Sequence, residues 1–195
     1  MIRIGIATLA ATLSTLGLTS LVKHQPQVVT SPETHEAQPT RAKLHRYTLP
    51  NGTAEEQRVL EFFQDRGITD KAALAVLLGN IKQESKFNTR ICEGGKTTGY
   101  HACHRGGFGL IQWTTPGRYA GLQRYARNNK CDINSLECQL GYLTHEIEWR
   151  KVEHAFKVDG KSIGHYMIFA DRWLGWGVHG ARTTYANQYY NQLSK

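Results

Sequence analysis

The segment TDKAALAVLLGNIKQESKFN, residues 69–88, carries the clearest helix pattern in the sequence. Its first residues, Thr69 and Asp70, have side chains that can accept hydrogen bonds from the free amides at the start of a helix. Apolar residues then recur with the spacing of one helix face, at Leu74, Leu77, Leu78 and Ile81. The segment therefore predicts a helix that buries this face in the domain core.

Glu84 follows Ile81 by three positions, so it continues the apolar face. Low-dielectric surroundings disfavour the ionised carboxylate and raise its pKa. A raised pKa is what a general acid working near neutral pH requires. The ordinary alternative is a charged residue in a solvated last turn of the helix. Further signals along the chain are needed to decide between the two.

Length and charge limit the possible functions. A chain of 195 residues holds one domain of ordinary size with an appendage. A formal net charge of +8 at pH 7 and a pI near 9.4 predict attraction to polyanions, whether nucleic acid, an anionic membrane or the acidic bacterial cell wall. The 9 tyrosines and 4 tryptophans suit stacking on sugars or bases. Charge alone does not choose between these partners.

The N-terminus has the pattern of a targeting segment. After Arg3, the run from Ile4 to Val22 has no charged residue, and it ends at Lys23. The run is rich in small and hydroxyl residues and lacks a clean cleavage site. We therefore expect residues 1–22 to be either a signal peptide or a membrane anchor. The protein would be exported, to the periplasm or cell envelope, the inner membrane, the medium or a virion.

Residues 23–52 have the composition of a linker, because they contain 4 of the 5 prolines and few large apolar residues. The folded domain is expected to span residues 53–195 and to be mainly α. Thr53 and Glu56 form a capping-box pattern, and further helix starts are expected at Thr115, Ser135 and Ser162. The helix from Ser135 is expected to reach position 147, and a last helix to span residues 181–193. No convincing run of alternating strand residues is present.

A glycine-rich loop, residues 89–114, follows the helix that carries Glu84 and ends in GGFGLIQW. Glycines allow the backbone to approach a ligand closely. Gln112 and Trp113 place a hydrogen-bonding amide beside a flat ring, which suits a pyranose. A single Trp is more often a core residue, and Phe108 and Leu110 also suit the core.

Several motifs now occur in a characteristic order: ES-x-FN at the end of a helix, then GFGLIQWT, then a Pro-Gly-Arg helix start. This arrangement resembles the phage tail lysozyme family and, more distantly, goose-type lysozymes and soluble lytic transglycosylases. The resemblance continues through QLGYLTHE and RTTYA, and so covers about residues 53–193. It implies a lysozyme-like domain that acts on peptidoglycan glycan strands. We expect no cofactor or metal.

The same resemblance implies that Glu84 is the catalytic acid and that Gln112 and Trp113 line the sugar cleft. The full set of expected substrate contacts is Ser85, Phe108, Gln112, Trp113 and Tyr119. Cleavage of the β-1,4 bond between N-acetylmuramic acid (MurNAc) and N-acetylglucosamine (GlcNAc) also needs a group that stabilises the oxocarbenium-like state. Candidates for a second carboxylate are Glu93 and Glu146, with Asp132 as a further option.

The type of reaction stays open at this point. Lytic transglycosylases of the resembled superfamily use one glutamate and release an anhydro sugar, so no second carboxylate is obligatory. A non-catalytic wall-binding module would keep the cleft but would have no need for an acid at Glu84. A nucleic-acid partner is not expected, since it would explain the charge but neither the N-terminal run nor the paired motifs.

The cysteines form two local pairs, Cys92 with Cys103 and Cys131 with Cys138. In an exported protein this spacing predicts two disulfides, each closing a short loop worth about 2–3 kcal/mol in the chain-entropy model. A zinc site built from Cys92, Cys103 and a neighbouring histidine is disfavoured, because the sequence has no tight Cys-x-x-Cys pair. In a cytoplasmic protein the cysteines would be free thiols.

Overall fold

The structure, a computed structural model, describes residues 46–104 and 106–195. The expected signal or anchor segment, residues 1–22, and the expected linker up to residue 45 lie outside the described residues. Within the described part of the chain, no helix has both the length and the apolar character needed to cross a bilayer.

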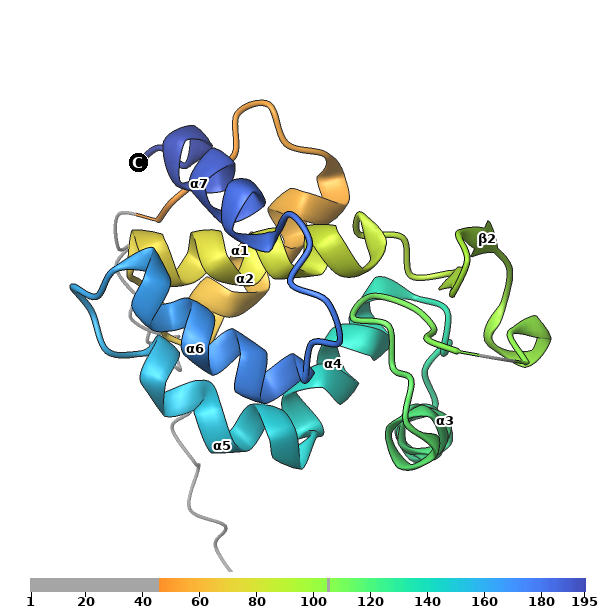
Figure 1. Ribbon diagram of the computed structural model, residues 1–195. Helices are drawn as coiled ribbons and strands as arrows, with labels where there is room; N and C mark the ends of the chain where they lie inside the picture. Colours follow the sequence, from red (N-terminus) through yellow and green to blue (C-terminus); the bar gives the residue numbers. More distant parts are fainter. Residues whose placement is uncertain (1–45, 105) are drawn as a thin grey trace, which may run out of the picture. The chain divides into compact units, whose positions relative to one another are not determined.

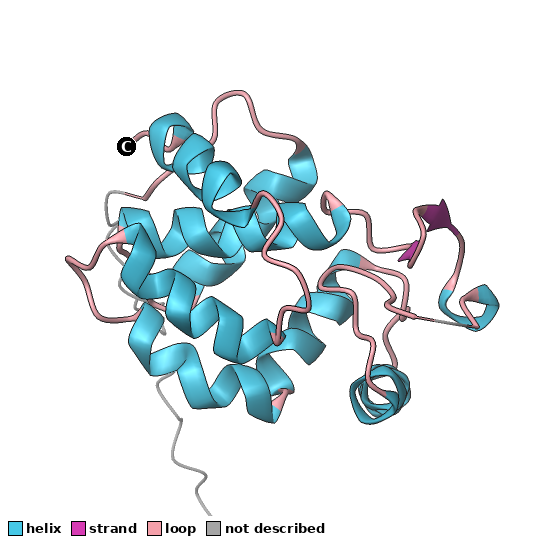
Figure 2. Ribbon diagram, in the orientation of Figure 1, coloured by secondary structure: helices cyan, strands magenta, loops and turns pink. Residues whose placement is uncertain are grey.

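The prediction of a mainly α domain is confirmed (Figure 1). A two-stranded hairpin and a short 3-10 helix, η1, lie between the second and third helices (Figure 2). In chain order the elements are α1 (Ala54–Asp65), α2 (Lys71–Ser85), β1 (Ile91–Cys92), β2 (Lys96–Thr97), η1 (Tyr100–Ala102), α3 (Pro116–Asn129), α4 (Leu136–His145), α5 (Ile147–Phe156), α6 (Ile163–Leu174) and α7 (Arg182–Gln192).

The helix α2 is the centre of the core rather than an amphipathic helix on its edge. Asp70 caps it, with Oδ1 accepting hydrogen bonds from the amides of Ala72 and Ala73 at 2.8 and 3.0 Å. Every residue from position 72 to 81 is buried, as expected for a helix that is apolar on nearly all sides. Figure 1 shows α7 on one side of α2, and α5 and α6 on the other. Near its C-terminal end, Lys82, Gln83 and Glu84 are only partly buried.

Gly79 allows α7 to lie unusually close to α2. A Cβ atom at this position would stand 2.5 Å from the backbone nitrogen of Ala186, inside van der Waals contact. The close approach brings Arg182, the first residue of α7, to the last turn of α2. A glycine in a helix interior usually costs stability, so its presence here is explained by packing.

We expect Gly79→Ala to destabilise the domain by about 2 kcal/mol, because the added methyl group must push two packed backbones apart. Gly164→Ala is the matched control: it is also helical, but its nearest neighbour is the Ser162 hydroxyl at 3.9 Å. The control should stabilise by up to about 1 kcal/mol through helix propensity. Urea unfolding of both variants gives the comparison, and equal effects would show that α2 and α7 can move apart freely.

The helix expected from Ser135 to position 147 is two helices in the structure. The backbone of Glu146 is extended, with ψ at 146°, and α5 begins directly after it. Ile147, expected on the apolar face, is 54% exposed. The ion pair between Glu146 and Arg118 of α3, described below, accompanies this break.

The domain begins earlier than position 53. Thr48 and Ser194 form an antiparallel bridge, with backbone hydrogen bonds of 2.8 and 3.1 Å. Leu49 is 5% exposed and belongs to the core. Residues 46–52, expected to be linker, are thus part of the folded domain, since proline content does not report contacts with the distant C-terminus.

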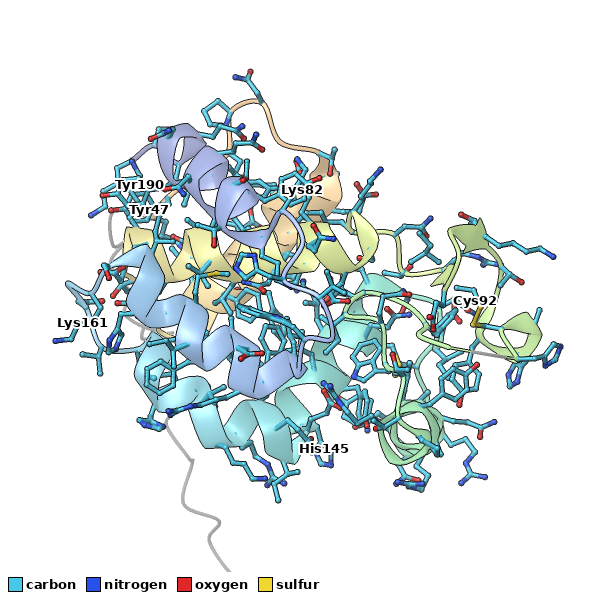
Figure 3. The ribbon with its side chains drawn as sticks, in the orientation of Figure 1. Tyr47, Lys82, Cys92, His145, Lys161 and Tyr190 are labelled. Atoms are coloured by element: carbon cyan, nitrogen blue, oxygen red, sulfur yellow. A yellow bond between two sulfur atoms is a disulfide. The ribbon has the colours of Figure 1, made fainter. Side chains whose placement is uncertain are left out.

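Both predicted disulfides are present. Cys92–Cys103 joins β1 to the end of η1, and Cys131–Cys138 joins the α3–α4 turn to α4. Figure 3 shows Cys92 within the hairpin region, beside the body of helices. The first disulfide closes the loop that carries Glu93, one of the residues that line the candidate site.

Candidate active site

A cleft of about 500 Å³ opens at the last turn of α2. It is formed by the end of α2, the hairpin and glycine-rich loop, the first turn of α3 and the α6–α7 loop. Its lining residues are Glu84, Glu93, Gly107, Gln112, Thr114, Thr115, Arg118, Leu174, Gly175 and Gly177. The cleft therefore combines two carboxylates with one arginine and several glycines.

Glu84 lies on the cleft wall with its side chain 15% exposed. The guanidinium of Arg182 donates a hydrogen bond from Nη2 to Glu84 Oε1 at 2.7 Å. Arg182 is itself buried against the ring of Trp176, with 5.1 Å between the guanidinium carbon and the ring centroid. Its Nη1 donates to the Asn80 carbonyl at 3.5 Å. These contacts hold Arg182 in place, so its hydrogen bond fixes the position of Glu84 Oε1.

The pKa of Glu84 is raised above the ordinary glutamate value. The main cause is burial, which removes water from the ionised form. The charges of Arg182 and Arg118 act in the opposite direction, but they do not outweigh the burial. Burial also lowers the pKa of Arg182, against the opposing effect of Glu84. Because arginine keeps its proton in proteins, the proton that can move at this pair is the one on Glu84.

Arg118 stands at the first turn of α3, and Glu146 holds it there. Two hydrogen bonds, of 2.8 and 2.9 Å, join its Nε and Nη2 to the carboxylate oxygens of Glu146. The Glu146 side chain is 1% exposed, and that of Arg118 is 15% exposed. Burial opposes the charge on Arg118, but the hydrogen bonds and charge of Glu146 raise its pKa overall. Glu146 is thus a buried counterion that does not line the cleft.

Glu93 does line the cleft with Glu84. Its backbone amide donates to the Gly107 carbonyl at 2.8 Å, and its Oε2 accepts from the Gly107 amide at 2.9 Å. Gly106 has a φ of +75°, and a Cβ there would stand 1.8 Å from Glu93 Oε2. The glycine pair therefore allows the carboxylate to lie flat against the loop. Asp132 instead accepts hydrogen bonds from Asn134 in the turn before α4.

Gln112 lines the cleft with its backbone in the left-handed region, at a φ of 51°. A non-glycine residue held in this region costs about 1–3 kcal/mol, and such residues cluster at active sites and ligand clamps. Its amide nitrogen donates to the carbonyls of Gly109 and Ile91 at 2.9 and 3.3 Å. The amide thus holds the glycine-rich loop against β1 and fixes the cleft wall.

The other expected substrate contacts do not line the cleft. Trp113 and Phe108 are completely buried, so they anchor the loop in the core and offer no face to a sugar. Ser85 is 2% exposed and donates to the Leu110 carbonyl at 2.7 Å. Tyr119 stacks on Tyr100 and its hydroxyl reaches the Cys103 carbonyl at 2.6 Å. These side chains position the loop. The sequence suggested substrate contacts instead, because a flat or polar residue type does not by itself reveal exposure.

The sequence did not predict the part of the cleft wall formed by the end of α6 and the α6–α7 loop, from Leu174 to Gly180. Leu174, Gly175 and Gly177 line the cleft, and Val178 is 78% exposed. It also missed Arg182 as the partner of Glu84. The glycine spacing of LGWGVHG was the available signal for the loop. Arg182 and Glu84 are 98 positions apart, so no local pattern connects them.

A family model described as phage tail lysozyme matches residues 54–193 of the chain. The match covers every helix of the domain and all of the cleft residues. No curated protein matches the chain.

Proposed function

Because the chain belongs to the phage tail lysozyme family, we propose that it cleaves the β-1,4 bond between MurNAc and GlcNAc, with Glu84 as general acid. Membership of the family implies peptidoglycan-degrading activity of the lysozyme type. The observation that carries the finer proposal is the single buried carboxylate of Glu84 at the cleft wall, with its raised pKa. A glycosidic oxygen leaves as an alcohol only when a proton reaches it, and a carboxyl group of raised pKa retains that proton at higher pH.

Arg182 has a positioning role in this proposal. Its hydrogen bond to Oε1 leaves the other carboxyl oxygen, Oε2, to carry the proton into the cleft. Its charge also keeps the pKa of Glu84 from rising further, so the acid can release its proton when the bond breaks. General acids work best when their pKa lies near the working pH.

Glu93 is the carboxylate best situated to act as the second group. It shares the cleft with Glu84, and it is exposed to solvent, so a water molecule or the developing cation can reach it. The carboxylate of Glu146 already accepts hydrogen bonds from Arg118, and that of Asp132 accepts them from Asn134 in the turn before α4. Glu93 would then stabilise the oxocarbenium-like state or activate water on the other side of the sugar.

A lytic transglycosylase of the same fold is the second candidate. It needs Glu84 alone, and the contact of Glu93 with the Gly107 amide is compatible with a structural role for Glu93. A non-catalytic wall-binding module is a weaker candidate, because a pure binder gains nothing from a buried acid held by an arginine.

We also propose that the protein acts outside the cytoplasm, which the two disulfides support. A membrane anchor in residues 1–22 rests on the sequence alone.

The experiment that tests the proposal is mass spectrometry of the soluble products released from purified peptidoglycan. Disaccharide peptides with a reducing MurNAc end are expected. Anhydro ends would identify the transglycosylase reaction, and reducing GlcNAc ends would place the cut at the other glycosidic bond. Binding of the protein to the wall without any release would identify a binding module.

Arg182→Met is expected to move the basic limb of the pH–activity profile to higher pH. Arg182 lowers the pKa of Glu84, so its removal raises that pKa further, and Glu84 then stays protonated to a higher pH. The measurement is kcat/KM for wall lysis across the pH range, compared with Arg172→Met, which changes an exposed arginine on α6. A basic limb that does not move, or that moves to lower pH, would contradict the role given to Arg182.

Glu93→Gln is expected to lower kcat for hydrolysis by about 100-fold, the order of magnitude when one stabilising group is lost from an active site. The glutamine oxygen can still accept the hydrogen bond from the Gly107 amide, so the loop should keep its shape. Steady-state lysis and product analysis provide the measurement. Activity within about twofold of wild type would remove Glu93 from the chemistry and favour a mechanism with one glutamate.

A further inference from the structure

A second groove, of about 680 Å³, lies between α3 and the α4–α5 corner. Thr115 and Arg118, at the start of α3, line both this groove and the catalytic cleft, so the two are adjacent. Residues of α3, α4 and α5 complete the lining, among them Arg124, Tyr125, Tyr142, His145, Glu148 and Arg150. We call this surface the α3–α5 groove.

The charges in the α3–α5 groove favour an anionic ligand. Arg118 is neutralised by Glu146, which leaves Arg124 on α3 and Arg150 on α5 as the exposed cations. Within the described residues, no ion pair engages Arg124, Arg150 or the half-buried Glu148. The lining thus holds three guanidinium groups, on Arg118, Arg124 and Arg150, and two carboxylates, on Glu146 and Glu148. Guanidinium is well matched to carboxylate ligands.

The groove is poorly suited to a sugar ring. Sugars usually stack on exposed aromatic faces, but here Tyr142 is 6% exposed and its hydroxyl donates to the Arg118 carbonyl at 2.8 Å. The Tyr125 ring lies 5.4 Å from the ring of His145, which Figure 3 shows beside α5 near α3. The exposed lining includes the guanidinium and amide groups of Arg124, Arg150 and Asn128, beside the imidazole of His145 and the apolar side chain of Ile147.

The substrate supplies an anionic branch close to this place. Each muramyl residue of peptidoglycan carries a short peptide with free carboxylates, attached through its lactyl group. Because the α3–α5 groove adjoins the cleft at Thr115 and Arg118, it lies within reach of a stem on a glycan strand in the cleft. We propose that the α3–α5 groove binds the carboxylate-bearing peptide stem of the strand being cleaved, with Arg124 and Arg150 as the recognising residues. This inference rests on the proposed function of the cleft.

The test compares two substrates and two matched variants. The substrates are intact peptidoglycan and strands whose stems have been removed by an amidase, which keep only the lactyl carboxylate on the sugar. The first variant is Arg124→Ala/Arg150→Ala. The control is Arg127→Ala/Lys151→Ala, which removes two exposed charges from the same two helices outside the groove.

On intact peptidoglycan, the groove variant is expected to raise KM about fivefold with kcat nearly unchanged, as for the loss of two solvent-exposed ion pairs. On stripped strands it should match wild type, and the control should match wild type on both substrates. An equal loss on both substrates would show that the groove binds glycan. An equal loss in the control would show only general attraction by charge. Either result, or no loss at all, overturns the proposal.

Direct binding separates this inference from the function of the cleft. Amide NMR shifts are followed while a free stem tripeptide with its carboxylates, or the same peptide with amidated carboxyl groups, is added to the protein. Shifts in the α3–α5 groove with the free-carboxylate peptide alone support the proposal even if no glycan cleavage is found. Shifts elsewhere, or none at concentrations that saturate wall binding, overturn it.

Discussion

Glu84→Gln is expected to reduce the rate of wall lysis by about 10²–10⁴-fold, the usual share of general acid catalysis. The amide has the shape of the carboxyl group but holds no acidic proton. Its oxygen still accepts the hydrogen bond from Arg182 Nη2, so the last turn of α2 should keep its position. The loss should appear in kcat, because the proton is needed at the step in which the glycosidic bond breaks.

The measurement is turbidity loss of purified walls, with far-ultraviolet circular dichroism and urea unfolding to show that the variant is folded. Glu137→Gln is the control, because it makes the same chemical change in an exposed residue of α4. If Arg182 without its counter-charge lowers stability, Glu84→Gln/Arg182→Met removes that buried charge as well and should remain inactive. Lysis within about threefold of wild type in a folded variant would refute the assignment of Glu84.

Glu146→Gln is expected to have the largest effect on stability among these variants. Glu146 is the buried counterion of Arg118, and its loss leaves a largely buried guanidinium without a compensating charge. Breaking a buried pair by removing one partner costs about 3–5 kcal/mol, and the 15% exposure of Arg118 argues for the lower end. Because Arg118 lines the cleft, lysis should fall as well.

The exposed pair Arg58–Glu137 provides the comparison, since its side chains are 38% and 60% exposed. Glu137→Gln should cost no more than about 1 kcal/mol. The double variant Glu146→Gln/Arg118→Met should regain much of the stability lost in Glu146→Gln, because no buried charge remains. It should not regain activity, because the cleft then lacks its arginine. Equal costs for Glu146→Gln and Glu137→Gln would mean that Glu146 is not a structural counterion.

The sequence predicts the parts of the fold that depend on local interactions better than those that depend on long-range contacts. The sequence predicts helix starts at Thr53, Asp70, Ser135 and Ser162, and each of these side chains accepts a hydrogen bond from a first-turn amide. These are contacts over two or three residues, which sequence reveals well. The break before α5 was not predicted, because the partner of Glu146 is 28 positions away on α3.

The sequence predicts the candidate site only as far as the helix phase and the family resemblance reach. Glu84 follows from the apolar face of α2, and Gln112 from the loop that succeeds it. The exposure of Trp113 could not be deduced, because an aromatic residue beside glycines suits both a core and a sugar platform. The pairing of Arg182 with Glu84 depends on the close contact of α7 with α2 at Gly79. This contact can be recognised only when the positions of both helices are known.

The most direct test of the central claim is a titration of the Glu84 carboxyl group by carbon-13 NMR, combined with the pH profile of wall lysis. We predict that this carboxyl titrates above the ordinary glutamate pKa of about 4.3, because burial disfavours its ionised form. We also predict that kcat/KM is lost as the pH rises through the same pKa, since the free enzyme must carry the proton. A carboxyl that titrates at or below the ordinary value, or a basic limb unrelated to its titration, would contradict Glu84 as the proton donor.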